Sequence, residues 1–200
     1  KDIGNKYDDY LRSYFKIPEH IPIFLYVGIL SPGRGLEKII DAFNSPSIQA
    51  HVAFVGYGEM LEYLTDISKS NNKVHVHGPV PHTEVVALAA SADVGLCLIE
   101  NISLSDYLCL PNKLFEYCFA GIPVLASNFP ELRRVISDYN LGICVDLDIE
   151  AIISSIESFN TDIKPDNTRA IADLSWEAQA KKLVLSYNTI TKHRKNQCHH

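Results

Sequence analysis

The chain has 200 residues, of which 46% are hydrophobic and 21% charged. It is therefore long enough for about one domain with a buried core, and too apolar to be disordered. Its 18 basic and 24 acidic side chains give a net charge of -6, which argues against a nucleic-acid partner, because such partners select a basic face. The longest apolar run, at 21–30, contains Pro22 and Gly28 and falls short of the roughly 18 residues of a membrane span.

The cysteines indicate the cellular compartment, and the chain ends indicate whether the sequence is a fragment. The cysteines are odd in number, show no spacing typical of a metal site, and mostly lie in apolar stretches, as buried free thiols do: Cys97, Cys109, Cys118, Cys144 and Cys198. This usage predicts a reducing, cytoplasmic compartment. The chain begins at Lys1 and shows no signal peptide, so we expect a fragment of a longer protein. The final residues, 195–200, resemble a tail with the remains of a purification tag.

Short apolar runs alternate with helical patterns along most of the chain. The runs predict six strands at 23–27, 51–55, 74–77, 94–99, 123–126 and 143–145. Because most are continuously apolar, we expect a parallel sheet that is covered on both faces. The fold class predicted is α/β, a Rossmann-like doubly wound parallel sheet of about six strands with helical crossovers.

Helix signals fill the gaps between these runs. The apolar spacing at 36–43 predicts an amphipathic helix, and Thr83 is placed to cap the start of another. A third helix is expected at 114–120, ending at Gly121, and Pro130 can open a fourth.

The pattern divides the chain into four parts. Residues 1–20 are polar and tyrosine-rich without a strand signal, residues 21–174 form the sheet domain, residues 175–194 form a separate C-terminal helix, and residues 195–200 are the tail. We expect this last helix to leave three apolar side chains uncovered: Trp176, Leu183 and Tyr187.

Two glycine-containing turns follow the first two strands. In the first, GILSPGRG at 28–35, Arg34 stands between glycines at the carboxyl end of a strand, where a guanidinium can meet a phosphate. A solvated turn with an incidental arginine is the alternative. In the second, Gly56 and Gly58 lack the third glycine of a dinucleotide fingerprint, because Leu61 holds that position. A plain strand-to-helix turn explains this segment at least as well as a ligand loop.

The segment LCLPNKLFEY at 108–117 carries the most chemistry. Pro111 suits the first turn of a helix, and no oxygen precedes it to cap the free N–H groups, which leaves them for an anion such as a diphosphate. Lys113 adds positive charge there, and Asn112, Lys113 and Glu116 share one face. The Glu116 carboxylate can accept hydrogen bonds from ribose hydroxyls. In the alternative interpretation, Asn112 caps the helix and Lys113 and Glu116 form a surface ion pair.

Metal sites are not expected. Asp146 and Asp148 match the DxD pattern of metal-dependent sugar transferases, but such pairs are common in loops before helices. His75 and His77 lie on one side of a predicted strand without a third ligand at suitable spacing, so we expect them to be core or rim residues.

The order and spacing of these motifs resemble the C-terminal, donor-binding domain of GT-B-type retaining glycosyltransferases, the group 1 or family 4 class, over about residues 20–190. The segment at 26–35 is similar to the family's VGRLxxxKG, with Arg34 at the place of its diphosphate-binding lysine and Ile29 at the place of its arginine. The segment at 54–58 is similar to its VGxG turn, and 76–80, which contains Gly78, to its xFxGxV stretch near the base.

The segment at 114–124 resembles the second half of the family's E-x7-E motif. The last glutamate, which binds ribose in the family, falls on Glu116, and the first falls on Leu108. The segment at 110–117 is similar to a subgroup with PNKLFEY, whose members often build bacterial surface polysaccharides. Residues 175–177 and the helix after them resemble the family's C-terminal crossover.

The resemblance implies the donor half of an enzyme that transfers a sugar from a nucleotide diphosphate sugar with retention. Arg34 and Glu116 would be its catalytic residues: Arg34, with amides near Asn112 and Lys113, would neutralise the leaving diphosphate, and Glu116 would orient the ribose. The implied donor contacts are Gly28, Arg34, Gly56, Gly78, Asn112, Lys113 and Glu116. No metal or other cofactor is implied.

The same resemblance implies where the rest of the enzyme lies. A saccharide or lipid-linked acceptor would bind a missing N-terminal domain, with residues 1–20 as the interdomain linker. The location implied is cytoplasmic, at the inner face of the membrane if the protein associates peripherally. Two alternatives are a nucleotide-sugar epimerase of the UDP-N-acetylglucosamine 2-epimerase type, which needs catalytic carboxylates and histidines in the cleft, and a non-catalytic nucleotide-binding module.

Overall fold

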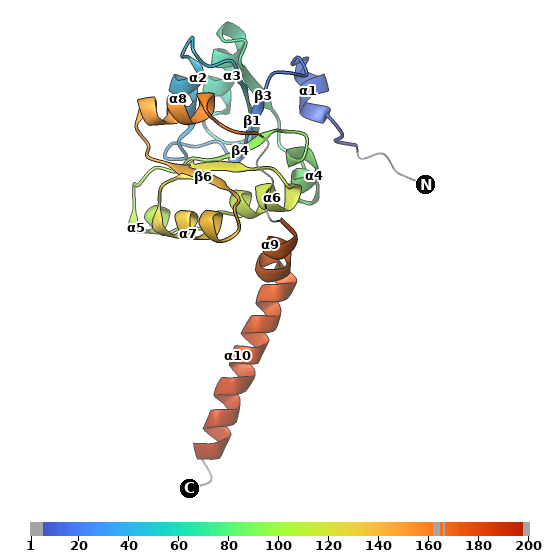
Figure 1. Ribbon diagram of the computed structural model, residues 1–200, viewed down its shortest axis with the longest axis vertical. Coiled ribbons are helices and arrows are strands. Elements are labelled where there is room, and N and C mark those ends of the chain that lie inside the picture. The colour runs from blue at the N-terminus through green and yellow to red at the C-terminus, as the bar shows by residue number, and fades with distance from the viewer. Residues whose placement is uncertain (1–5, 162–164, 166, 198–200) are drawn as a thin grey trace.

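A single parallel sheet organises the chain (Figure 1), and the computed structural model describes residues 6–161, 165 and 167–197. The sheet has six strands in the order β3-β2-β1-β4-β5-β6. The strands are β1 (Ile23–Ile29), β2 (His51–Tyr57), β3 (Val74–His77), β4 (Val94–Cys97), β5 (Val124–Ser127) and β6 (Gly142–Val145). This is the strand order of a Rossmann-like doubly wound fold, with the order reversing between β1 and β4. The predicted fold class is confirmed.

Helices cover both faces of the sheet (Figure 1). The first face carries α2 (Leu36–Phe43), α3 (Leu61–Ser70) and α8 (Ile149–Glu157), whose buried side chains form one apolar cluster with that face. The second face carries α4 (Val85–Ala89), α6 (Asn112–Ala120) and α7 (Pro130–Asp138) over a second cluster. A short α5 (Leu104–Tyr107) lies in the connection between β4 and α6.

Most predicted helices are confirmed and one predicted cap is wrong. Gly121 ends α6 with a φ of 76°, and Pro130 opens α7. Thr83 caps no helix: it lies inside a 3-10 turn at His82–Glu84 that runs directly into α4, and neither start has a side-chain cap. The proline before it accounts for the difference, because the N–H of Glu84 bonds to the carbonyl of Pro81 and closes the turn with backbone alone.

The fourth strand is shorter than the predicted 94–99, since β4 ends at Cys97. Beyond it, the Ser127 hydroxyl donates to the Ile99 carbonyl at 2.8 Å and accepts from the Ile99 N–H at 2.7 Å. Ser127 is fully buried. A side chain on the neighbouring strand therefore takes over where the backbone ladder stops.

Both ends of the described chain are helical. In the segment predicted to lack strands, α1 (Tyr10–Phe15) places aromatic rings against the edge strand β3, where Phe15 stacks on His75 at 4.7 Å between ring centroids. After α9 (Asn167–Leu174), α10 (Trp176–Gln197) projects away from the sheet (Figure 1). Tail residues 198–200 lie outside the described residues.

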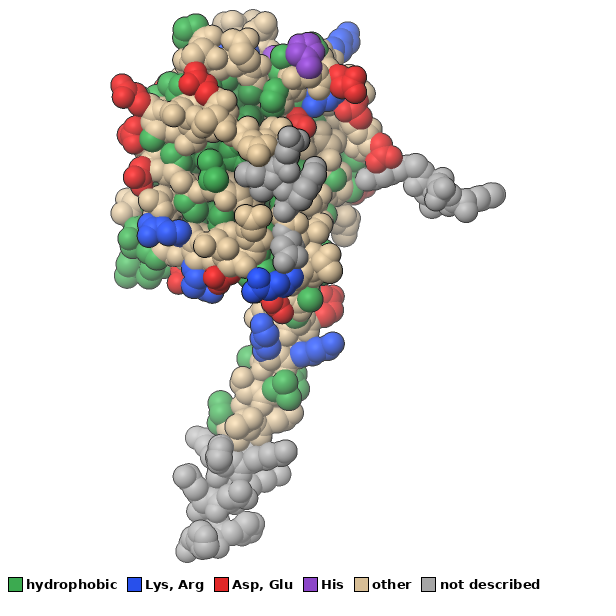
Figure 2. Space-filling model, in the orientation of Figure 1, with side chains coloured by type: hydrophobic (Ala, Val, Ile, Leu, Met, Phe, Trp, Pro, Cys, Tyr) green, Lys and Arg blue, Asp and Glu red, His purple; other side chains and the backbone are tan. Residues whose placement is uncertain are grey.

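The expected uncovered apolar surface on the C-terminal helix is confirmed. Trp176, Leu183 and Tyr187 have exposed fractions of 80%, 70% and 68%, and Figure 2 shows hydrophobic side chains along the projecting α10. Even so, among the helices of the described chain none has both the length and the apolar character needed to cross a bilayer.

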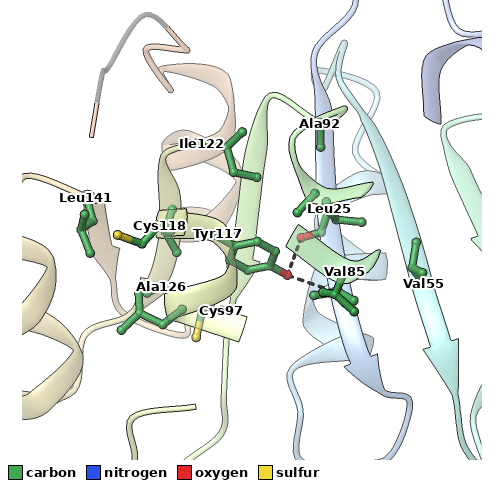
Figure 3. Close-up of a cluster of buried hydrophobic side chains, with 14 of the residues drawn as sticks. Leu25, Val55, Val85, Ala92, Cys97, Tyr117, Cys118, Ile122, Ala126 and Leu141 are labelled. Atoms are coloured by element: carbon green, nitrogen blue, oxygen red, sulfur yellow. Dashed lines mark hydrogen bonds between the residues drawn. The ribbon is translucent and has the colours of Figure 1, made fainter. Parts of the chain in front are cut away.

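Tyr117 on α6 fixes that helix to the sheet at the point where β1 and β4 separate. The β1–β4 ladder pairs Phe24 with Val94 and Leu25 with Gly95 and goes no further. The buried Tyr117 hydroxyl enters the gap, donating to the Leu25 carbonyl at 2.9 Å and accepting from the Val27 N–H at 3.0 Å. Figure 3 shows the Tyr117 hydroxyl directed toward Leu25, with dashed lines for its hydrogen bonds. The helix start that follows β4 is thereby held next to the end of β1.

A stacked histidine pair at the β3 edge makes stability depend on pH. His51 Nδ1 lies 2.8 Å from His75 Nε2, and burial, with a smaller contribution from His51, lowers the pKa of His75 to about 4. Between the unfolded value of 6.5 and about 4 the unfolded chain binds more protons, so we expect the free energy of unfolding to fall as pH falls through this window.

Urea unfolding at pH 7, 6 and 5 measures this dependence. A His75→Leu variant has no imidazole at this position and should show a shallower fall over the same range. Equal slopes for the two proteins would contradict the assignment to this histidine.

Candidate functional site

A cavity with a volume of about 610 Å³ lies at the carboxyl ends of β1 and β2, beside the first turn of α6. This is the edge where doubly wound sheets hold ligands. Six of the seven predicted site residues line it: Gly28, Arg34, Gly56, Asn112, Lys113 and Glu116. Gly78 is exposed and is not among the lining residues, although its neighbours Pro79 and Val80 are.

Glycine is required at one strand end because the backbones meet there. A Cβ on Gly56 would lie 1.9 Å from the carbonyl oxygen of Gly28, and the φ of Gly56 is +157°. Gly28 has a φ of +132°, with Lys113 Cε 3.9 Å from the place of its Cβ. These two glycines therefore shape the floor of the cavity through backbone geometry.

Arg34 lies in the turn between β1 and α2, with left-handed glycines on both sides. Its guanidinium Nη1 is 3.9 Å from Asp106 Oδ1, and the side chain is 42% exposed. A contact this long and exposed holds the arginine weakly. The guanidinium is thus available to an anion in the cavity.

The start of α6 has the geometry predicted for an anion site. Pro111 is the N-cap residue, with a φ of -73° and a ψ of 149°, and no side chain caps the helix. The alternative in which Asn112 supplies the cap is therefore wrong: Asn112 is the first helical residue and is exposed. The free N–H groups and the positive end of the helix dipole lie at the cavity.

The alternative of a surface ion pair between Lys113 and Glu116 is also wrong. Lys113 is half-buried as a residue, but its ammonium nitrogen is shielded from solvent and has no hydrogen-bond partner among the described residues. It lies 3.4 Å from the centroid of the Tyr26 ring. Burial is the main cause that lowers the pKa of Lys113 to about 8.

Glu116 faces a different partner, His82. Its Oε1 lies 3.5 Å from His82 Nε2, and the Glu116 side chain is only 16% exposed. Burial raises the pKa of the Glu116 carboxyl, while His82 and Lys113 partly offset this. A mostly buried acceptor whose present partner is an exposed imidazole suits a carboxylate that a ligand hydroxyl can approach.

The sequence pattern did not indicate several residues that line the cavity. His82 gave no signal beyond a predicted helix start, and Val27, Val55 and Val85 looked like ordinary core residues. The apolar wall also includes Tyr57 and Val80, which lie in segments that the resemblance had marked. The cavity lining therefore combines these apolar residues with charged ones, Arg34, Lys113 and Glu116. Such a combination fits a ligand with a flat ring at one end and negative charge at the other.

The unpartnered ammonium of Lys113 should reduce the stability of the ligand-free protein. Replacing Lys113 with Met keeps the volume and removes the buried charge, so we expect the free energy of unfolding to rise by about 1–2 kcal/mol at pH 7, after allowing for the lost contact with the Tyr26 ring. Urea unfolding measures it. Lys69→Met, on an exposed ion pair, is the matched control and should change stability by less than about 0.5 kcal/mol.

The sign of the pH effect follows from the lowered pKa. Between about 8 and 10.5 the unfolded chain holds the Lys113 proton and the folded chain does not, so the wild type gains stability with rising pH. The advantage of Lys113→Met should therefore shrink from pH 7 to pH 10. An advantage that stays constant would contradict a buried, charged Lys113.

The motifs weighed as metal sites have structural partners. Asp148 caps α8 by accepting from the Ala151 N–H, and Asp146 accepts from the Asn128 side chain. His77 bonds to the Tyr10 hydroxyl at 3.0 Å, and His75 to His51. Within the described part of the chain, no group of three or more His, Cys, Asp or Glu side chains is placed to hold a metal ion.

The sheet order, the glycine turns and the uncapped α6 define a Rossmann-like domain with a cavity at its switch point. The chain matches the family described as glycosyl transferases group 1 over residues 11–173, and it belongs to that family. No curated protein sequence gives a significant match.

Solved structures of glycosyltransferases share the fold. Sucrose-phosphate synthase from Thermosynechococcus elongatus is 20% identical with a TM-score of 0.67, and the match covers 91% of this chain and 48% of that one. The Anabaena protein HepE, in complex with UDP and glucose, is 18% identical with a TM-score of 0.67 over 88% and 51%. WaaG, a glycosyltransferase involved in lipopolysaccharide biosynthesis, is 19% identical with a TM-score of 0.59 over 86% and 48%. The chain thus spans about half the length of these proteins.

Proposed function

We propose that the full protein transfers a sugar from a nucleotide diphosphate sugar to an acceptor, with retention of anomeric configuration, and that this chain supplies the donor site. One observation carries the proposal: Arg34, the uncapped start of α6 and Glu116 surround a single cavity at the carboxyl ends of the strands. Membership of the group 1 glycosyl transferases supports it.

The chemistry asked of this half is charge stabilisation. As the bond between sugar and diphosphate breaks, negative charge grows on the leaving diphosphate. The first N–H groups of α6 are held by the helix at the edge of the cavity, and the Arg34 guanidinium lines it. Groups that stabilise the charge of the leaving diphosphate in this way are among the largest contributions to catalysis. Glu116 orients the nucleoside by accepting from the ribose hydroxyls. No metal and no protein nucleophile from this half take part in the proposed reaction.

The proposal places the acceptor outside the described cavity. A saccharide or lipid-linked acceptor binds a second domain, with residues 1–20 as the linker and α10 as the helix that returns to it. The uncovered apolar side chains of α10 support this arrangement. We further propose a role in surface polysaccharide or glycoconjugate synthesis, at the cytoplasmic side of a membrane.

Assays with the full-length protein test the proposal. UDP-, GDP- and ADP-sugars are offered with saccharide and lipid-linked acceptors, and the anomeric configuration of the product is determined by NMR. We expect one donor to be consumed with retention. The 200-residue chain alone should bind the matching nucleoside diphosphate and transfer no sugar, because an oriented, dry site needs both walls of the cleft. Failure of every donor to bind would overturn the proposal.

A further inference from the structure

Lys113 carries a positive charge that has no counter-charge in contact with it among the described residues. Its Nζ is buried with no hydrogen-bond partner among the described residues, and no carboxylate of that part of the chain lies within 4.0 Å of it. A buried ammonium normally has an anion or several acceptors, because desolvation without a partner is costly. Here it has the face of the Tyr26 ring at 3.4 Å.

Lys113 and the ring that it contacts belong to elements on opposite faces of the sheet. Lys113 belongs to α6, which packs on the second face, whereas the Tyr26 ring belongs to the apolar cluster under α2 on the first face. The β1–β4 ladder ends at Leu25 and Gly95, so a gap lies beyond that pair. The lysine lies beside Gly28, near the end of β1, and it lines the cavity there.

The titratable groups that surround Lys113 do not neutralise it. Arg34 repels it from the turn after β1, and Glu116 on its own helix attracts it from beyond ion-pair distance. Cys97 on β4 is a neutral thiol, because burial raises its pKa to about 12, and burial also raises the pKa of Cys109. The missing negative charge must therefore come from the cavity, where the helix start and Arg34 favour the same kind of ligand.

We propose that the diphosphate of the donor completes Lys113: its ammonium group pairs with a diphosphate oxygen, and binding of a nucleoside diphosphate is accompanied by uptake of a proton on Lys113 Nζ. The inference rests on the proposed donor site and adds a specific contact and a proton linkage to it. It also gives the site a second cation beside Arg34, whereas Ile29, at the place of the family's arginine, carries no charge.

The direction of the linkage follows from the empty site. With a pKa of about 8, Lys113 is about half protonated at pH 8 when no ligand is present. A diphosphate beside Nζ raises that pKa, since an opposite charge favours the protonated form. Binding at pH 8 therefore draws about half a proton from the buffer, and affinity falls about tenfold from pH 7 to pH 9.

Isothermal titration calorimetry of the full-length protein measures this linkage. UDP, ADP and GDP are each titrated at pH 8 in two buffers of different ionisation enthalpy, together with uridine, adenosine and guanosine. We expect proton uptake for the diphosphate that binds and none for its nucleoside. Lys113→Met should weaken diphosphate affinity about tenfold and abolish the uptake, while leaving nucleoside affinity unchanged.

Two matched variants complete the design. Lys69→Met removes an exposed lysine and should keep both affinity and proton uptake. Arg34→Ala should weaken diphosphate binding and move the proton uptake to higher pH, because it removes a positive charge that lowers the pKa of Lys113. Uptake that shifts in Arg34→Ala but is abolished in Lys113→Met separates the two cations. Unchanged uptake in a folded Lys113→Met, or wild-type binding without uptake, would overturn the inference while leaving the donor site intact. If no diphosphate binds the wild type, the proposed function and this inference fail together.

Discussion

Replacing Tyr117 with Phe should lower the free energy of unfolding by about 2–4 kcal/mol, although it removes a single oxygen atom. The Tyr117 hydroxyl is buried between β1 and β4, where it accepts from the Val27 N–H and donates to the Leu25 carbonyl, with the Leu96 carbonyl 3.3 Å away. Without it, backbone groups of two neighbouring strands lose a partner in a place that water does not reach. Urea unfolding followed by circular dichroism measures the loss.

A tyrosine on the surface provides the control for this substitution. Tyr63 on α3 is 47% exposed, so Tyr63→Phe should change the free energy of unfolding by less than about 0.5 kcal/mol. Equal, small losses for the two variants would show that the Tyr117 hydroxyl does not bridge the strands. The Tyr117→Phe substitution also tests whether the Tyr117 hydroxyl positions Lys113 and Glu116, since both lie on the same helix.

Gly95 explains why this arrangement is possible. A Cβ on Gly95 would lie 2.3 Å from the ring of Tyr117, which is fully buried. Because Gly95 has no side chain, β4 leaves at this position the space that the Tyr117 ring occupies. This pairing of a glycine with an aromatic residue on another element has no sequence pattern of its own, because it depends on how α6 packs across the strand.

The sheet was predictable because its strands are apolar on both faces. Each predicted run overlaps an observed strand, and Pro130 and Gly121 mark the expected helix ends. The errors occur where tertiary contacts decide. Strand β4 ends at Cys97, and beyond it a side chain, Ser127, bonds to Ile99 in place of the backbone ladder. The turn before α4 is closed by backbone rather than by Thr83.

The cavity was predictable for a different reason: topology brings the carboxyl ends of parallel strands together, so Arg34 and the start of α6 had to be neighbours. The individual contacts were not predictable. Lys113 and Glu116 are three residues apart on one helix face, which predicts an ion pair. The structure instead turns Lys113 toward Tyr26 and Glu116 toward His82, two residues from other elements that helix spacing alone does not reveal.

Glu116 is the residue of the proposed donor site whose replacement should weaken nucleotide binding through the ribose. Glu116→Gln keeps the shape and removes the charge that would accept hydrogen bonds from the ribose. Hydrogen bonds to charged groups contribute roughly 1.5–3 kcal/mol, so we expect nucleoside diphosphate affinity to fall about tenfold or more. Calorimetry on the full-length protein measures it. Because burial raises the pKa of Glu116, binding should also weaken toward acidic pH as the carboxylate is protonated, and this dependence should vanish in the variant.

Arg34→Ala separates ribose recognition from diphosphate recognition. Arg34 is partly exposed and its contact with an anion is largely Coulombic, so its loss should weaken diphosphate binding less at high salt than at low salt. A nucleoside without phosphate distinguishes the two residues: its affinity should fall in Glu116→Gln and stay unchanged in Arg34→Ala. If a folded Glu116→Gln protein binds both ligands as tightly as the wild type, Glu116 does not contact the ribose. The carboxylate would then serve only its present neighbour, His82, at the rim of the cavity.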